Sequence, residues 1–405
     1  MAQNTSLPTI KLKPGHVQPV WAGHPWVYAQ AVDKVEGAPG RGDLVRVVDP
    51  RGNLLGRGFY SPQSALVVRI LVRNEETPVD AALFASRIRH ANEARRSVGI
   101  GTDDPSDARA TTGYRVVHAE GDGLPGLIVD RFGDAVVVQF LTYGMKQRET
   151  EIVTALQEAL SPTTIIDRSP ASSAKTEGFE PGAGVIAGKN ITSLTFKERG
   201  LSFEIPLELG QKTGFYFDQR EVRARVEQLA KGKRVLDAYS YVAAFGMSAA
   251  RGGASHVLSV DENALAVEVG ASCARANGLS QHMELIPRDA RRVLSDAKGS
   301  YDLVIVDPPR LAPTRAAKEK AMFAYGKLAE LGCRATKHGG TLVFCSCSAA
   351  VDLNMLSRAL SLGALRANVQ AIVMERMFQG ADHPVSAAFP EGLYLKTLFV
   401  RVESR

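Results

Sequence analysis

The sequence predicts an α/β protein with a small N-terminal β-barrel, a small central α+β domain and a C-terminal domain built on a doubly wound parallel sheet. Three observations predict this. Short β-branched segments broken by Gly, Pro and Asp fill residues 37–71, strands flank one helix between residues 114 and 160, and apolar strands alternate with helices from about residue 192. Strands of a parallel sheet are covered by helices on both faces, so they read as near-continuous apolar runs.

Composition limits the classes of protein that the chain can belong to. Of its 405 residues, 45% are hydrophobic and 23% are charged, and no apolar run approaches the roughly 20 residues of a membrane span. The first residues lack the apolar stretch of a secretory signal, so we expect a cytoplasmic protein. The four cysteines lie in the last third of the chain, in a layout that predicts neither a disulfide framework nor a metal site.

The N-terminal segment is basic. Residues 1–74 hold nine Lys and Arg against four Asp and Glu, within a net charge of +6 for the chain. A basic, strand-rich module suits contact with RNA phosphates, although an ordinary solvated surface has the same composition. Lys11 and Lys13 are the candidate RNA-binding residues here, and Trp21 and Trp26 are expected to fill the barrel core.

The central segment contains a helix, a polar loop and a group of strands. A helix is predicted over residues 81–98 with a basic face formed by Arg87, Arg89, Arg95 and Arg96. A loop follows at 101–112, strands at 114–118, 127–129 and 135–141, and a helix at 147–160. The turn-forming residues 180–184 predict a linker. We therefore expect domains at 1–74, 75–190 and 191–405.

The C-terminal segment alternates strands and helices. Strands are predicted at 234–237, 256–260, 283–286, 301–306 and 341–344, and helices at 245–251, 264–277 and 316–337. Ligands of such sheets bind at the carboxyl ends of the strands, so the residues that follow each strand are the first candidates for a site.

An aspartate ends each of the first four of these strands: Asp237, Asp261, Asp289 and Asp307. Any single one is explained as a cap of the following helix. The recurrence of an aspartate after all four strands favours a binding site. In such a site Asp261 accepts hydrogen bonds from ribose hydroxyls and Asp289 reaches an adenine amino group.

The acids predict S-adenosylmethionine (SAM) as the cofactor. No G-x-x-x-x-G-K-[ST] loop is present, and the turn after Asp237 has alanines in place of the G-x-G-x-x-G pattern of dinucleotide sites. Four carboxylates suit a cofactor that carries a sulfonium, a ribose and an adenine. Tyr239, Ser240 and Phe245 in and after this turn are further candidates for cofactor contact.

Cys347, in Ser346-Cys347-Ser348 after an apolar strand, is the candidate nucleophile. Addition of a thiolate at carbon 6 of cytosine converts the ring into an enamine that can attack a methyl sulfonium, and Asp307 would stabilise the adduct through the ring nitrogen or the exocyclic amine. The target base must first leave its stack. A buried hydrophobic role is the alternative for Cys347 and the expected role of Cys273 and Cys333, while Cys345 is a weaker candidate.

At this point the chain resembles, along nearly its full length, the bacterial 23S rRNA cytosine-5 methyltransferases that carry an N-terminal PUA domain. The matching stretches are GHPWVY at 23–28, GDGLPGLIVDRFG at 121–133, GQKTGFYFDQR at 210–220, DPP at 307–309, SCS at 346–348 and ADHP at 381–384. The resemblance implies a PUA-like domain, a small central domain, a Rossmann-like methyltransferase domain, SAM as cofactor and Cys347 as nucleophile. 23S ribosomal RNA is then the expected partner.

Residues of the matching stretches add to the candidate site. Arg220 and Gln211 are assigned to the cofactor, and Lys212, Arg310 and His383 to RNA, although surface ion pairs or structural roles explain each equally well. Phe215, Tyr216 and Phe217 line the pocket or belong to the core.

The chain also departs from the family pattern. Ala243 and Ala244 replace the glycines of the cofactor turn, Arg310-Leu311 replaces Lys-Phe, and Ser169-Pro170 replaces Ser-Asp. The added methyl groups of the two alanines could crowd the methionine moiety.

Two other functions remain open from the sequence. The chain could methylate another base, such as guanine at N7 or N2, with Cys347 in a structural role. It could also be an RNA-binding ribosome assembly factor without activity, which the alanines of the cofactor turn would favour. The oligomeric state is open too, with a homodimer as one option.

Overall fold

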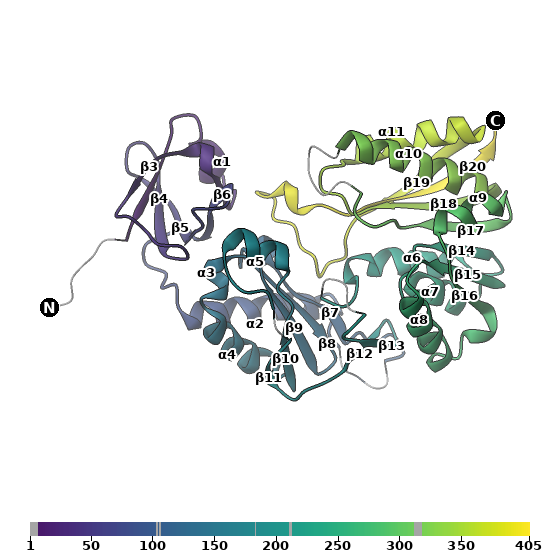
Figure 1. Cartoon of the computed structure of the whole chain (residues 1–405), viewed down its shortest axis with the longest axis horizontal. Coiled ribbons are helices and arrows are strands. Elements are labelled where there is room, and N and C mark those ends of the chain that lie inside the picture. The colour runs from purple at the N-terminus through teal and green to yellow at the C-terminus, as the bar shows by residue number, and fades with distance from the viewer. Residues whose placement is uncertain (1–6, 103, 105–106, 183, 210–212, 312–317) are drawn as a thin grey trace. The chain divides into compact units, whose positions relative to one another are not determined.

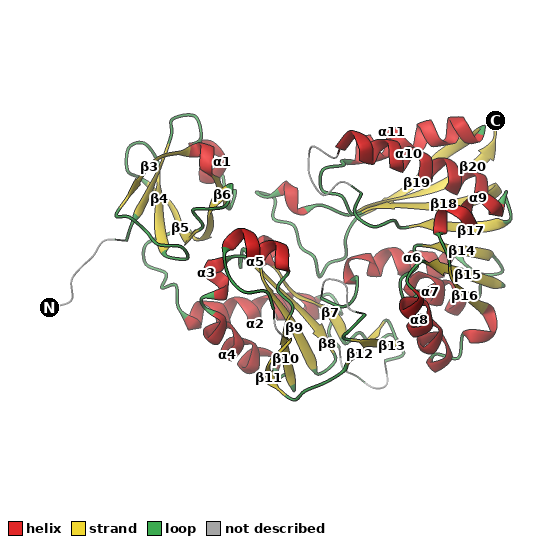
Figure 2. Cartoon of the chain, in the orientation of Figure 1, coloured by secondary structure: helices red, strands yellow, loops and turns green. Residues whose placement is uncertain are grey.

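The computed structural model describes residues 7–102, 104, 107–182, 184–209, 213–311 and 318–405. The chain forms two compact units, and each is built from separate stretches of sequence. Unit 1 comprises Met1–Gly200, Pro206–Phe215 and Ala381–Gly392, and unit 2 comprises Leu201–Ile205, Tyr216–Gly380 and Leu393–Arg405. Figure 1 follows the chain by colour from purple to yellow, and Figure 2 marks its helices and strands.

The N-terminal part of unit 1 is a mixed sheet with strand order β2-β6-β5-β4-β1-β3. Its elements are β1 (Thr9–Leu12), α1 (Val17–Trp21), β2 (Trp26–Tyr28), β3 (Val32–Glu36), β4 (Leu44–Val48), β5 (Leu54–Tyr60) and β6 (Leu66–Val72). β1 pairs parallel with β4, and the neighbouring pairs are antiparallel. Alternate residues such as Ile10, Val45, Val47 and Val68 form the core, so the predicted strands are confirmed.

The expectation that both tryptophans fill this core is wrong. Trp21 is 75% exposed at the end of the short helix α1, and Trp26 is only partly buried. The indole Nε1 of Trp26 donates to Glu120 at 2.8 Å, and its ring packs edge-on against Phe389 at 4.5 Å. The buried residues of the barrel core are aliphatic, and Tyr60 packs against them from its margin.

The central part of unit 1 is a sheet with strand order β11-β10-β9-β8-β7. Its strands are β7 (Gly113–His118), β8 (Leu127–Phe132), β9 (Ala135–Phe140), β10 (Thr164–Asp167) and β11 (Gly184–Gly188), followed by β12 (Ser193–Glu198). Its helices are α2 (Ala81–Ser97), α3 (Tyr143–Lys146), α4 (Glu149–Leu160) and α5 (Ala171–Glu177). Asp80 caps the N-terminus of α2, and its carboxylate accepts from the amide of Leu83 at 3.0 Å. α2 and α4 share one apolar core with the strands.

Two further expectations for this part are wrong. The linker expected at 180–184 is not one between domains, because its last residue, Gly184, begins β11, which pairs antiparallel with β10 of the same sheet. Arg95 does not belong to a basic surface of α2, because its side chain is only 2% exposed and forms an ion pair with Asp122. Its acidic partner lies far along the chain, so the sequence pattern of the helix did not reveal the pair.

Unit 2 is built on a sheet with strand order β16-β15-β14-β17-β18-β20-β19. Its strands are β14 (Arg234–Ala238), β15 (His256–Asp261), β16 (Met283–Pro287), β17 (Tyr301–Val306), β18 (Thr336–Ser346), β19 (Val369–Met377) and β20 (Lys396–Ser404), and β13 (Leu201–Pro206) precedes them. Its helices are α6 (Arg220–Leu229), α7 (Ala244–Arg251), α8 (Ala264–Ala276), α9 (Ala290–Ala297), α10 (Lys318–Ala335) and α11 (Leu353–Ala367).

Helices cover both faces of this sheet, as a doubly wound fold requires (Figure 2). α9, α10 and α11 pack on one face around Leu236 and Val304, while α6 and α7 pack on the other around Val235 and Leu303. The five strands in the order β16-β15-β14-β17-β18 pair parallel with one another. β20, the next strand, is antiparallel to both β18 and β19. The predicted strands therefore form the parallel part of the sheet, and β19 and β20, which the sequence did not predict, add an antiparallel part.

The parallel register places the predicted site at one edge of the sheet. Asp237 pairs with Ser259 on one side and Ile305 on the other, so β14, β15 and β17 end at the same level. Asp261 is the last residue of β15, and Asp307 directly follows β17. Ser346 ends β18. The four strand ends therefore bring the predicted cofactor residues and the Cys347 segment to the same edge.

Candidate functional site

Asp237 lies at the base of the turn between β14 and α7 and is fully buried. Its Oδ2 accepts a hydrogen bond from the amide of Gly246 at 2.9 Å and one from the Ser259 hydroxyl at 3.3 Å. A Cβ at Gly246 would lie 2.3 Å from the oxygen of Ser259, so glycine is required for this close approach. The carboxylate thus lies at the N-terminal turn of α7, where the helix dipole favours negative charge.

The surroundings of Asp237 disfavour the ionised form of its carboxyl. Burial raises the pKa of its carboxyl to about 7, with further raising contributions from Asp307 and Asp261, against the hydrogen bonds from Gly246 and Ser259. Three carboxylates therefore lie within electrostatic reach of one another. Such a cluster favours a cation as its ligand.

We expect Asp237→Asn to stabilise the cofactor-free protein, and more so at high pH. The unfolded carboxyl loses its proton near pH 4, whereas the folded one keeps it up to about pH 7, so this residue costs stability as pH rises between the two values. Asparagine removes that cost, which is on the order of 4 kcal/mol at most at pH 8. Urea unfolding at pH 5 and pH 8 measures it.

The matched control for this experiment is Asp302→Asn in β17. Its carboxyl pKa is lowered because the amide of Arg234 and the ammonium of Lys337 outweigh a partial burial, so its removal costs stability at high pH instead. If Asp237→Asn raised the free energy of unfolding by the same amount at both pH values, the raised carboxyl pKa of Asp237 would be contradicted.

Asp261 is fixed by backbone amides. Its Oδ2 accepts from Tyr241 at 2.8 Å and its Oδ1 from Asn263 at 3.0 Å, and the residue is partly exposed. These contacts orient the carboxylate at the end of β15 and leave each oxygen with further lone pairs. The geometry suits acceptance of two ribose hydroxyls.

The turn between Asp237 and α7 is strained. Tyr239, Tyr241 and Ala243 have φ angles of 65°, 51° and 58°, in the left-handed region that favours glycine. Strain of this kind costs of order 1 kcal/mol or more per residue and gathers at functional sites. Ala243, one of the two alanines of this turn, therefore keeps the left-handed conformation at an energetic cost.

The residues of this turn fit SAM. Within the described residues, Oδ1 of Asp237 and Oγ of Ser240 are buried and have no hydrogen-bond partner. A buried polar atom without a partner costs 1–3 kcal/mol, roughly, so a ligand that donates to these oxygens would be stabilised there. Donors and a positive charge are what SAM offers. Asp237, Ser240 and Asp261 are the residues that would hold it.

Other predicted cofactor residues have different surroundings. Asp289 caps α9 through the amide of Arg291 at 2.8 Å and also pairs with the Arg291 guanidinium, which holds the pKa of its carboxyl below the usual value. Phe245 is buried in the core between α6, α7 and the sheet. Tyr239 is partly buried, and burial raises the pKa of its phenol to about 12. Contacts of these three residues with a cofactor remain predictions.

Cys347 lies in a segment that is held from two sides. The Ser346 hydroxyl donates to the Tyr325 phenol oxygen at 2.9 Å, and the same phenol lies 3.1 Å from the hydroxyl of Ser348. The ammonium of Lys396 donates to the Ser348 carbonyl at 2.8 Å. Cys347 itself is partly exposed between these two buried serines.

The other cysteines are enclosed. Cys273 in α8 and Cys333 in α10 are buried in helices, which confirms the core role predicted for them. Cys345 in β18 is fully buried, and burial raises the pKa of its thiol well above the usual value. Cys347 is thus the cysteine with access to solvent.

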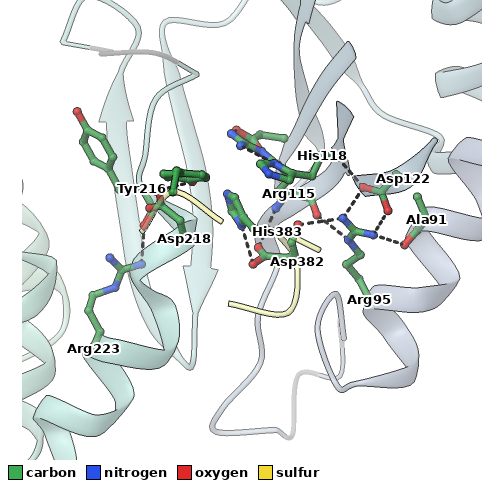
Figure 3. Close-up of polar contacts among 12 residues, drawn as sticks. Ala91, Arg95, Arg115, His118, Asp122, Tyr216, Asp218, Arg223, Asp382 and His383 are labelled. Carbon is green, nitrogen blue, oxygen red and sulfur yellow. Dashed lines mark hydrogen bonds and ion pairs between the residues drawn. The ribbon is translucent and has the colours of Figure 1, made fainter. Parts of the chain in front are cut away.

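Tyr216 is a site residue whose role the sequence left open. Its carbonyl accepts from the Arg223 guanidinium at 3.0 Å, a contact drawn in Figure 3, and its ring meets Tyr241 edge-on at 5.6 Å. Burial chiefly raises the pKa of its phenol, and the negative charges of Asp307 and a Cys347 thiolate add to that. Tyr216 therefore lies near both predicted catalytic groups, while its neighbours Phe215 and Phe217 are core residues.

The remaining predicted residues are scattered. Arg220 begins α6, is 2% exposed and has its guanidinium 5.7 Å from the Phe217 ring centre. Arg310 is exposed after Asp307-Pro308-Pro309, while Gln211 and Lys212 lie outside the described residues. In unit 1, Lys11 is partly buried in β1, and exposed Lys13 donates to the carbonyl of Gln30 at 3.1 Å. RNA contacts of these residues remain predictions.

His383 belongs to a buried polar cluster of unit 1. Asp382 receives the amide of Arg115 at 3.0 Å and pairs with His383, whose ring centre lies 4.9 Å from that of His118 (Figure 3). Burial chiefly lowers the pKa of His118 well below its usual value, so His118 is neutral. Because His383 is only 2% exposed, its surroundings are those of a structural histidine.

Arg95 joins two of the sequence stretches that suggested the family. Its guanidinium donates to Asp122 at 2.7 Å and to the carbonyl of Asp382 at 2.9 Å (Figure 3). A Cβ at Gly121 would lie 2.1 Å from the carbonyl oxygen of Pro384, so this position requires glycine. The stretches at 121–126 and 381–384 therefore pack against each other within unit 1.

No group of three or more His, Cys, Asp or Glu able to hold a metal ion occurs among the described residues. In the same part of the chain, no helix combines the length and the apolar character needed to cross a membrane.

Comparison with known proteins agrees with the geometry. A model of the PUA-like domain matches residues 10–73, and a model of S-adenosylmethionine-dependent methyltransferases matches residues 125–384. The chain is 35% identical over 399 residues to the ribosomal RNA large subunit methyltransferase I of Shewanella denitrificans, covering 97% of this chain and 99% of the relative. The protein of the same name from Shewanella amazonensis is 35% identical over 398 residues, with the same coverage.

A solved structure shows the same fold along the chain. SMU.776, a proposed methyltransferase complexed with SAH, superposes with a TM-score of 0.82 at 21% identity and covers 97% of this chain and 99% of its own. The predicted fold class and the predicted cofactor are confirmed. The chain belongs to the S-adenosylmethionine-dependent methyltransferases that carry an N-terminal PUA-like domain, and SAM is its cofactor.

Proposed function

We propose that the chain methylates carbon 5 of a cytosine in 23S ribosomal RNA through a covalent adduct with Cys347. The observation that carries this proposal is a partly exposed thiol that follows β18 directly beside the end of β17, where Asp307 lies, at the edge of the sheet that also holds Asp237 and Asp261. The name that the Shewanella relatives carry supports ribosomal RNA as the substrate. The PUA-like domain supports RNA as the partner.

The chemistry requires a nucleophile, because carbon 5 of cytosine does not attack a methyl group unaided. In the proposed reaction the Cys347 thiolate adds to carbon 6, and the ring electrons move to carbon 5 as an enamine. The cofactor supplies an electrophilic methyl group. After carbon 5 has taken the methyl group, it loses its proton to a base, the carbon–sulfur bond breaks and the thiolate is regenerated.

Asp307 and Tyr216 have supporting roles in this proposal. Asp307 accepts a hydrogen bond from the exocyclic amine of cytosine or, when protonated, donates one to the ring nitrogen, and both contacts distinguish cytosine from uracil. The ring of Tyr216 provides an apolar surface beside a base that has left its stack. The domain division at 1–74, 75–190 and 191–405, with Lys11, Lys13, Lys212 and Arg310 assigned to RNA, belongs to the same proposal.

Analysis of the methylated nucleoside tests the substrate and the position together. The purified chain is incubated with isotopically labelled SAM and 23S or 16S ribosomal RNA from cells that lack the gene. We expect labelled 5-methylcytidine in 23S RNA, at one position, by mass spectrometry of nuclease fragments. A labelled guanosine, or label in 16S RNA alone, would contradict the proposed reaction.

A further inference from the structure

Lys396 is a buried lysine at the start of β20 and was not among the sequence candidates. It pairs with Ser346 across the antiparallel ladder between β18 and β20, and only 3% of the residue is exposed. Lysine is rarely buried, because removing an ammonium from water costs several kcal/mol, roughly. Its retention at this position therefore calls for a reason other than stability of the fold.

The contacts of Lys396 point to the Cys347 segment. Its Nζ donates to the carbonyl of Ser348 at 2.8 Å, one residue beyond Cys347. The Tyr325 phenol holds Ser346 and Ser348 from α10, so the segment is fixed on two sides. Cys347 is thereby confined between two anchored residues, with the ammonium on one side.

The charge of Lys396 is coupled to Cys347. Burial lowers the pKa of the ammonium to about 8, while the negative charges of a Cys347 thiolate and of Asp352 raise it. At neutral pH most of the ammonium is therefore protonated. By reciprocity, a cation that is stabilised by a thiolate stabilises that thiolate.

We propose that Lys396 is a positioning residue that anchors the Cys347 segment through Ser348 and supplies the positive charge that keeps the Cys347 thiol ionised. This inference rests on the proposed function, in which Cys347 is the nucleophile. It adds the source of thiolate stabilisation that a covalent route needs near neutral pH. Lys396 acts through Cys347 and need not touch the RNA.

The pH dependence of thiol alkylation tests the charge directly and requires no methyl transfer. Iodoacetamide reacts with thiolates, and Cys347 is the partly exposed cysteine while the other three are buried. The full-length chain, with Cys347→Ser as the blank, is alkylated between pH 5.5 and 10. We expect a midpoint below the value of about 8.5 that is typical of a free thiol.

Three substitutions separate the charge from the hydrogen bond. Lys396→Met removes both, Lys396→Gln keeps an N–H donor without the charge, and Lys396→Arg keeps the charge. We expect the Met and Gln variants to raise the midpoint by about one pH unit, so that alkylation at pH 7 slows about tenfold, while Arg restores the wild-type midpoint. The matched control is Lys337→Met. Lys337 lies in β18 and pairs with Asp302, so its removal should leave the midpoint of Cys347 unchanged.

The outcomes are distinct. A wild-type midpoint in both Lys396→Met and Lys396→Gln would overturn the inference, and so would a raised midpoint in Lys396→Arg equal to that in Lys396→Met. Thermal unfolding of each variant shows whether it is folded. If the neutral variants do not fold, the wild-type chain still decides, because a Cys347 midpoint at or above about 8.5 would itself overturn the inference. Because alkylation does not depend on the RNA, the inference and the covalent mechanism fail separately.

Discussion

Replacement of Cys347 by alanine is expected to lower the rate of methyl transfer by at least about 10³-fold, the scale seen when a covalent nucleophile is removed from an enzyme. The physical reason is that carbon 5 of cytosine becomes a nucleophile only after addition at carbon 6. Affinity for SAM should change little, because the residues that we propose to hold the cofactor are Asp237, Ser240 and Asp261. Single-turnover methylation of 23S RNA with labelled SAM measures the rate.

The control for this experiment is Cys345→Ala. Cys345 lies two residues before Cys347, within β18, but it is fully buried and accepts the Thr397 hydroxyl at 3.4 Å. Its removal should leave methyl transfer within a factor of a few of wild type. Retention of the wild-type rate in Cys347→Ala, or its loss in Cys345→Ala alone, would show that another group starts the reaction.

The second large effect is expected for Asp261→Ala, which should weaken SAM binding by about 100-fold. The amides of Tyr241 and Asn263 orient the carboxylate, so both oxygens are in place to accept ribose hydroxyls. Each hydrogen bond to a charged group contributes about 1.5–3 kcal/mol, and the loss of two such bonds at the lower value is close to two powers of ten. Calorimetry with SAM gives the affinity.

Asp302→Ala is the matched control for Asp261→Ala. Asp302 is an aspartate of the same sheet, near the start of β17 rather than at a strand end, and it pairs with Lys337. Ligands of parallel sheets bind at the carboxyl ends of strands, so this variant should bind SAM normally. An unchanged affinity in Asp261→Ala would remove this residue from the cofactor site.

The parallel part of the sheet could be predicted from the sequence because the information is local. Runs such as the apolar residues of β17 identify buried strands, and an acidic residue after each run identifies the edge where a ligand binds. The positions of Asp237, Asp261 and Asp307 at one edge follow from that register. For the same reason the helices α7, α8 and α10 lie close to their predicted ranges.

What the sequence did not reveal depends on residues distant along the chain. Lys396 meets the Cys347 segment only because β20 runs antiparallel to β18, which a pattern of parallel strands does not suggest. Tyr325 reads as an ordinary core residue of a helix until both serines are placed against its hydroxyl. Arg95 reads as a surface charge until Asp122 is placed beside it. Local patterns cannot predict such tertiary partners.

The covalent trapping of RNA tests the central claim most directly. In a 23S RNA fragment that carries 5-fluorocytidine at the target, fluorine replaces the hydrogen that must leave carbon 5, so the carbon–sulfur bond cannot break after methylation. We predict a SAM-dependent adduct of one RNA per chain, with the RNA attached to the peptide that contains Cys347 by mass spectrometry. An adduct that persists in Cys347→Ala, or methylation of normal RNA without any trapped species, would contradict the account.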